Sequence, residues 1–117
     1  MNLFSFYLAE LFPKPILAAS MSKLDENKEL TLSCSISGFR KANFSILRKN
    51  SNGDIWLKNS RNLTMRVNVN DTGSYICKAE VRGIVKESRP VRINVYGELI
   101  QRLRTQWWWG EIKTVNL

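Results

Sequence analysis

Few residues of this 117-residue chain have types and spacing that could support catalysis or metal binding. The chain contains no histidine and two cysteines, Cys34 and Cys77. It therefore cannot form a catalytic triad with a histidine base, nor a structural zinc site with four cysteine or histidine ligands. No pair of polar residues in the strands has the arrangement of a general acid and base. We therefore predict a protein that is not an enzyme, with no catalytic residue, metal, cofactor or small-molecule substrate.

Three triplets match the acceptor motif for N-linked glycosylation, an asparagine followed two positions later by serine or threonine. Their asparagines are Asn43, Asn62 and Asn70. Asn43 and Asn62 fall on the outward phase of predicted strands, where a glycan would not enter the core. Asn70 adjoins a tight turn and is the weaker acceptor. The set favours a chain that passes through the secretory route.

Five segments alternate apolar and polar residues with a period of two, the pattern of half-buried β-strands. They are residues 30–36, 42–47, 63–69, 75–81 and 91–95. Turns rich in glycine, asparagine and serine separate them, including the Arg82-Gly83 tip between the last two strands. In this alternation Leu47 and Ile76 point outward and Val69 points inward. Together the strands predict an all-β fold, an antiparallel β-sandwich.

Each of the two cysteines lies on the inward phase of its strand. We therefore predict a Cys34–Cys77 disulfide between the two sheets. The two cysteines are 43 positions apart. In the chain-entropy account, closing a loop of that length contributes roughly 4 kcal/mol to the stability of the folded domain. The alternative is a pair of reduced core cysteines in a cytosolic protein.

The run Asp71-Thr72-Gly73-Ser74-Tyr75-Ile76-Cys77 resembles the immunoglobulin superfamily. In that family Asp-x-Gly-x-Tyr-x-Cys leads into strand F, and the tyrosine hydroxyl bonds to upstream backbone in a tyrosine corner. The resemblance assigns this role to Asp71, Gly73 and Tyr75, and it implies an immunoglobulin-like sandwich with Greek-key topology. One departure is the missing core tryptophan, whose place Ile46 takes, so aliphatic packing against the disulfide is expected. Trp56 lies too late in the chain to replace it.

The resemblance covers residues 10–96, which we predict to be one immunoglobulin-like domain. Residues 1–9 are predicted to be a leader or fragment end, and residues 97–117 a tail that is disordered or mis-spliced. Residues 10–15, Glu-Leu-Phe-Pro-Lys-Pro, resemble the start of domains in the related Fc-receptor-like group and predict a first strand that contains proline. The chain shows no clear signal peptide and no apolar run of the roughly 20 residues that span a bilayer.

The chain is basic, with 18 lysines and arginines against 10 acidic residues and a net charge of +8. Candidates for binding an anionic glycan such as a glycosaminoglycan are Arg40, Lys41, Lys78, Arg82, Lys86 and Arg92. These charges would gather on one side if the strands that carry them share a sheet. The alternative is a solvated face with acidic residues interspersed. No nucleic acid is expected, because no stacking aromatic residues alternate with the charges.

The resemblance implies an extracellular module of a cell-adhesion or immune-receptor glycoprotein, on the outer side of the plasma membrane within a larger single-pass protein. Such a module would act as a glycosylated spacer or a protein-interaction domain in cell–cell adhesion and signalling. Its partners would be proteins on cell surfaces and neighbouring immunoglobulin-like domains of the parent chain. Two alternatives stay open: an intracellular structural immunoglobulin domain of a scaffold protein, and a heparin-binding soluble decoy fragment.

Overall fold

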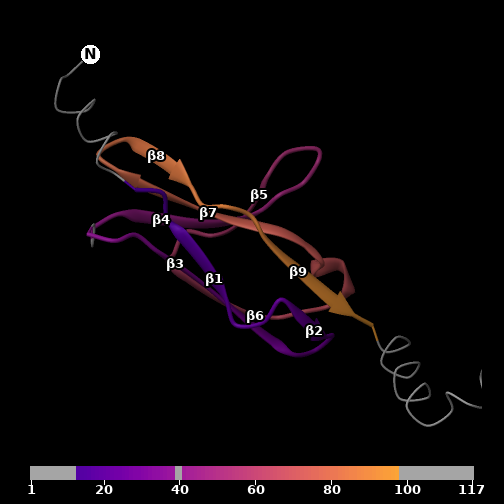
Figure 1. The fold of residues 1–117 in the computed structure, drawn as a ribbon. Helices are drawn as coiled ribbons and strands as arrows, with labels where there is room; N and C mark the ends of the chain where they lie inside the picture. Colours follow the sequence, from indigo (N-terminus) through magenta and orange to yellow (C-terminus); the bar gives the residue numbers. More distant parts are fainter. Residues whose placement is uncertain (1–12, 39–40, 98–117) are drawn as a thin grey trace, which may run out of the picture.

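The structure is a computed structural model that describes residues 13–38 and 41–97 (Figure 1). Its elements within these ranges are β1 (Ile16–Ala19), β2 (Lys23–Asp25), β3 (Glu29–Ser35), β4 (Asn43–Arg48), β5 (Ile55–Lys58), β6 (Asn62–Arg66), the 3₁₀ helix η1 (Val69–Asp71), β7 (Gly73–Val81), β8 (Ile84–Glu87) and β9 (Val91–Tyr96). One sheet has the order β1-β3-β6, and the other has the order β2-β9-β7-β4-β5 with β8 beside β7. The predicted all-β immunoglobulin-like sandwich is confirmed.

The five predicted strands appear as β3, β4, β6, β7 and β9. Sequence alternation missed β1, β2, β5 and β8, each of three or four residues. Segments this short contain too few alternations to establish a period. One pairing departs from the antiparallel expectation, because β2 runs parallel to β9.

The first strand begins at Ile16, after both nearby prolines, so the prediction of a proline-containing first strand is wrong. Ile16 pairs with Ser35 at the start of the β1–β3 ladder. Proline has no N–H to donate to such a ladder, and its exclusion from β1 follows from that. Residues 1–12 and all of the predicted tail beyond Gly97 lie outside the described residues, and the domain boundaries stay a prediction.

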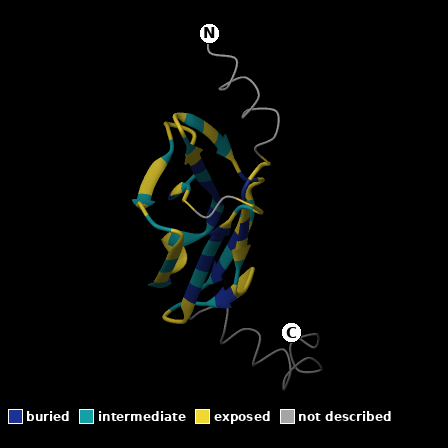
Figure 2. Ribbon diagram, turned by 90° about the vertical axis from the view of Figure 1, so that its left-hand side faces the viewer, coloured by how far each residue is buried: buried dark blue, intermediate teal, exposed yellow. Residues whose placement is uncertain are grey.

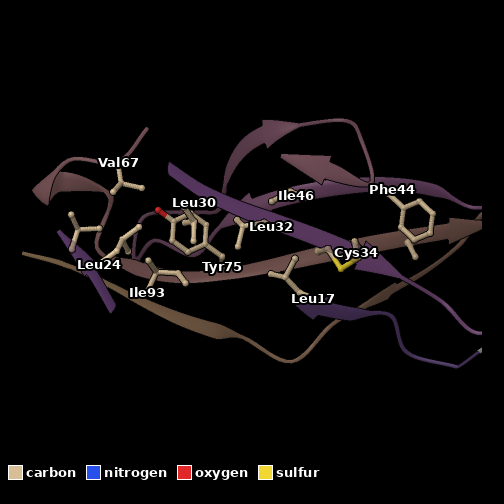
Figure 3. Packing of buried hydrophobic residues seen from close by; sticks show 13 residues of the cluster. Leu17, Leu24, Leu30, Leu32, Cys34, Phe44, Ile46, Val67, Tyr75 and Ile93 are labelled. Carbon is tan, nitrogen blue, oxygen red and sulfur yellow. A yellow bond between two sulfur atoms is a disulfide. The ribbon is translucent and has the colours of Figure 1, made fainter. Parts of the chain in front are cut away.

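The core lies between the two sheets and is apolar (Figures 2 and 3). Side chains that are wholly buried there come from both layers: Leu30, Leu32, Ile46, Tyr75 and Ile93. Ile46 pairs with Cys77 in the β4–β7 register. An aliphatic residue therefore packs beside the disulfide at the place where the family's tryptophan was expected, as predicted from the sequence.

The two-residue period fails to predict exposure at three positions. Leu47 and Ile76 lie on the outer face of their sheet, yet their exposed fractions are 0% and 2%. They pair with each other across β4 and β7, and Leu47 also pairs with Trp56 of β5. Val69 was expected to point into the core, but β6 ends at Arg66, and Val69 is 48% exposed in η1.

Ser88 is a buried polar residue between β8 and β9. It binds the backbone of β7 at Cys77, which lies between the residues that pair with β8 and those that pair with β9. Its hydroxyl accepts a hydrogen bond from the Cys77 N–H at 2.9 Å and donates to the Arg89 carbonyl at 3.1 Å. Its own N–H donates to the Cys77 carbonyl at 2.8 Å. Both backbone groups of the buried cysteine are therefore satisfied by one residue.

We expect Ser88→Ala to lower the free energy of unfolding by about 1–3 kcal/mol, because the buried Cys77 N–H would lose its acceptor. Urea unfolding followed by circular dichroism measures the change. The matched control is Ser51→Ala in the exposed β4–β5 turn, which should change stability by less than about 0.5 kcal/mol. Equal stabilities of the two variants would contradict this role of Ser88.

Candidate functional site

A disulfide joins Cys34 of β3 to Cys77 of β7 and so connects the two sheets. The two Cα atoms are 6.2 Å apart, and both residues are buried, with exposed fractions of 1% and 0%. The predicted inter-sheet disulfide is therefore present. It lies in the middle of the core, beside Ile46 and near Leu17 (Figure 3).

The residues of the predicted tyrosine corner come together at the start of β7. The Tyr75 hydroxyl donates a hydrogen bond to the Asp71 carbonyl, and the Tyr75 side chain is wholly buried. The Asp71 carboxylate accepts from the Asn68 N–H at 2.8 Å, and the Asn68 side chain accepts from the Asn70 N–H at 2.8 Å. This reciprocal capping closes η1 and fixes the carbonyl that the tyrosine binds.

Two further residues of the same motif have roles that the spacing did not reveal. The Thr72 hydroxyl accepts from the Val95 N–H at 2.9 Å and donates to the Val95 carbonyl at 3.3 Å, which holds β9 beside the corner. At Gly73, an added Cβ would lie 3.1 Å from Nε of Arg48. Arg48 in turn donates to the Thr72 carbonyl at 3.1 Å. Glycine therefore leaves room for the arginine that crosses the start of β7.

Burial raises the pKa of the Tyr75 phenol above its ordinary value of 10.0. Arg48 acts in the opposite direction and Asp71 in the same direction, both through their charges. Because the folded domain disfavours the phenolate, the unfolded chain loses this proton first as the pH rises. Below the pKa that Tyr75 has in the unfolded chain, its neutral side chain makes its full contribution to stability. That contribution is lost as the pH rises through the higher pKa of the folded domain.

We expect Tyr75→Phe to be less stable than the unmodified chain by about 1 kcal/mol at neutral pH, through loss of the hydrogen bond to Asp71. Between about pH 9 and pH 11 its stability should fall less steeply, because phenylalanine cannot ionise. Urea unfolding across this pH range gives both quantities. Parallel pH profiles for the two proteins would show that Tyr75 does not govern alkaline unfolding.

The three predicted glycosylation acceptors are all exposed. Asn43 begins β4 and Asn62 begins β6, so they lie in different sheets, whereas Asn70 lies in η1. The exposure of Asn43 and Asn62 agrees with the expectation that both point outward from their strands. Their occupancy stays a prediction.

The outer face of the larger sheet carries an exposed aromatic residue that sequence reasoning did not assign to a surface. Trp56 pairs with Leu47 and is 58% exposed. The Lys78 Nζ lies 5.8 Å from the centroid of the Trp56 ring and 3.7 Å from Glu87 Oε1. The cation and the ion pair restrain the indole at a solvent-accessible position.

A groove of about 730 Å³ opens beside Trp56. The residues that line it include Asn43, Ser45, Trp56, Asn59, Ser60 and Glu80. The Ser45 hydroxyl donates to Asn59 Oδ1 at 3.3 Å, which links β4 to the β5–β6 connection at the rim. The groove thus brings together a glycosylation acceptor, an exposed indole and several hydrogen-bonding groups.

The predicted basic residues do not form one cluster. Lys78 pairs with Glu87 on the outer face, whereas the register places Lys86 opposite Ala79 and therefore on the other side of the sheet. The expectation that the charges gather on one side is wrong for Lys86, because β8 continues β7 as a hairpin and its residues alternate between faces.

The other basic candidates are distributed around the sandwich. Lys41 is exposed before β4, and Arg82 is exposed in the β7–β8 turn, where its φ is 52°. Arg92 pairs with Ser74 on the outer face. Arg40 lies outside the described residues. Binding of a glycosaminoglycan stays a prediction.

Within residues 13–38 and 41–97, no group of three or more histidine, cysteine, aspartate or glutamate residues could hold a metal ion. Over the same ranges, no helix has both the length and the apolar character needed to cross a membrane.

The chain belongs to the immunoglobulin-domain family, whose model matches residues 14–95. Over 88 residues, it is 40% identical to platelet endothelial cell adhesion molecule of Bos taurus and 40% identical to that of Mus musculus. These matches cover 75% of this chain but only 11% and 12% of the relatives, so the chain spans about a tenth of their length. Its similarity to cell-adhesion proteins therefore concerns one immunoglobulin domain.

Solved structures give the same fold. The second Ig-C2 domain of human Fc-receptor like A superposes with a TM-score of 0.60 at 25% identity, covering 74% of this chain and all of that domain. Murine CEACAM1b superposes with a TM-score of 0.58 at 21% identity, covering 72% of this chain and 45% of that one. The predicted resemblance to the immunoglobulin superfamily and its Fc-receptor-like group is confirmed.

Proposed function

We propose that this chain is an extracellular, glycosylated, non-enzymatic module of a cell-adhesion or immune-receptor protein. The observation that carries the proposal is the 40% identity to platelet endothelial cell adhesion molecule over 88 residues, or 75% of this chain. The structural neighbours share the fold at the lower identities of 25% and 21%. The module would act in cell–cell adhesion and signalling.

The inter-sheet disulfide supports an oxidising compartment. Disulfides persist in secreted and extracellular proteins and are rare in the reducing cytosol. The Cys34–Cys77 bond therefore favours an extracellular module over an intracellular scaffold domain, in which the same two residues would be free thiols. Three exposed glycosylation acceptors agree with this compartment.

The positions at which the chain enters and leaves the described domain support a role as one domain in a row of several. Lys14 and Pro15 lie beside Pro90, before β9 begins, whereas Tyr96 at the end of β9 pairs with Asp25. The described chain thus enters at one end of β9 and leaves at the other (Figure 1). This geometry suits a spacer that joins neighbouring immunoglobulin-like domains, and weak contacts between such rows gain strength from valency.

We expect protein isolated from cells that express the gene to carry N-linked glycans and a closed disulfide. Intact mass spectrometry under non-reducing conditions, before and after glycosidase digestion, measures both. The mass should fall on digestion, and alkylation without reduction should label neither cysteine. Heat-inactivated glycosidase is the control. Unglycosylated protein with two alkylated cysteines would instead establish the intracellular scaffold alternative.

Sequencing the full transcript on both sides of residues 10–96 tests the adhesion role itself. We expect further domains with paired cysteines and a membrane-spanning segment in the same reading frame. A transcript that encodes this domain alone, with no anchor, would contradict an adhesion module and favour a soluble decoy.

A further inference from the structure

We infer that the groove beside Asn43 seats the first N-acetylglucosamine residues of an N-linked glycan carried by that asparagine, with Trp56 as the stacking surface. The inference rests on the proposed function, because the glycan is added only to chains that enter the secretory route. The groove would hold one glycan, and Trp56 would position it.

The strand register places the acceptor and the indole on the same face. Asn43 pairs with Glu80, Ser45 with Lys78 and Leu47 with Ile76, and all of these lie on the outer side of the larger sheet. Trp56 pairs with Leu47 from the neighbouring strand. Successive outward residues of a strand are about 7 Å apart, so a short oligosaccharide on Asn43 that runs along β4 would reach Trp56.

The groove offers the chemistry that a sugar ring requires. A pyranose has a face of C–H groups, which pack on the electron-rich face of an indole, and a rim of hydroxyl and amide groups. Trp56 is 58% exposed, and Asn59, Ser60 and Glu80 supply polar atoms around it. The volume of about 730 Å³ lies within the range of known small-ligand sites.

The site is already formed before any sugar enters it. Lys78 restrains the ring of Trp56, and the bond from Ser45 to Asn59 holds the rim. A preformed surface loses little conformational entropy when a ligand docks. The covalent bond to Asn43 also makes docking intramolecular, so a weak stacking contact suffices to keep the glycan in place.

Asn62 provides an internal reference in the same molecule. It is exposed, begins β6 in the smaller sheet and pairs with Ser33. Its N–H donates to the hydroxyl of the lining residue Ser60 at 3.2 Å, but its own pairing with Ser33 places it on the outer face of the smaller sheet, and it does not line the groove. A glycan on Asn62 should therefore be as accessible to enzymes as an ordinary surface glycan, whereas one on Asn43 should be shielded.

The test is the rate at which each glycan is removed from the native protein. The full chain is produced behind a secretory leader in mammalian cells and treated with peptide-N-glycosidase in ¹⁸O water, and peptide mass spectrometry measures release at each asparagine. We expect the glycan on Asn62 to be released at least about three times as fast as the glycan on Asn43. One aromatic contact that protects the Asn43 glycan would account for a ratio of this size. Trp56→Leu keeps an apolar side chain at the position paired with Leu47 but removes the indole, and it should bring the two rates close together.

The matched control is Ile55→Ala, which alters an exposed neighbour on the same strand and should leave the ratio unchanged. A ratio that is the same in the unmodified chain and in Trp56→Leu would overturn the inference, as would a glycan on Asn62 without one on Asn43. Both of these outcomes leave the proposed function standing. Absence of glycan from all three acceptors would overturn the proposed function together with the inference.

Discussion

The disulfide between Cys34 and Cys77 is the constraint on which the two layers of this domain depend. β3 is the middle strand of the smaller sheet, and β7 pairs with β4, β8 and β9 in the larger one. A single covalent bond thus joins the most highly paired strand of each layer. The surroundings of the disulfide are well packed and hydrogen-bonded, because Ile46 packs beside it and Ser88 binds the backbone of Cys77.

The start of β7 sets the geometry of the core around Tyr75. The hydroxyl of Tyr75, the carboxylate of Asp71 and the hydroxyl of Thr72 each bind backbone rather than solvent. Together they fix a 3₁₀ turn, the entry of β7 and the course of β9. With the core fixed at the disulfide and at Tyr75, the outer surface of the larger sheet can carry an exposed tryptophan and a polar groove without disturbing the core.

The sequence predicted the strands that are long enough to show a clear alternation of apolar and polar residues, and the disulfide that joins two of them. β3, β7 and the disulfide between them followed from inward phase, and the motif around Tyr75 supported the fold. Short strands such as β5 lack a measurable period, and the burial of Leu47 and Ile76 on the outer face departs from the two-residue alternation. The Asn43 triplet was visible, but its groove depends on the β5–β6 connection and on cross-strand register, neither of which local sequence specifies.

The position of the disulfide also determines how the domain would respond to mechanical load. A force applied between the two chain ends is transmitted through Cys34 and Cys77, because the bond bypasses the 43-residue interval between them. That interval cannot lengthen while the bond is intact, which withholds about 150 Å of contour at roughly 3.4 Å per residue. Only the segments before Cys34 and after Cys77 can be drawn out, so a domain under tension would release about half of its contour while the interval between the cysteines stays closed.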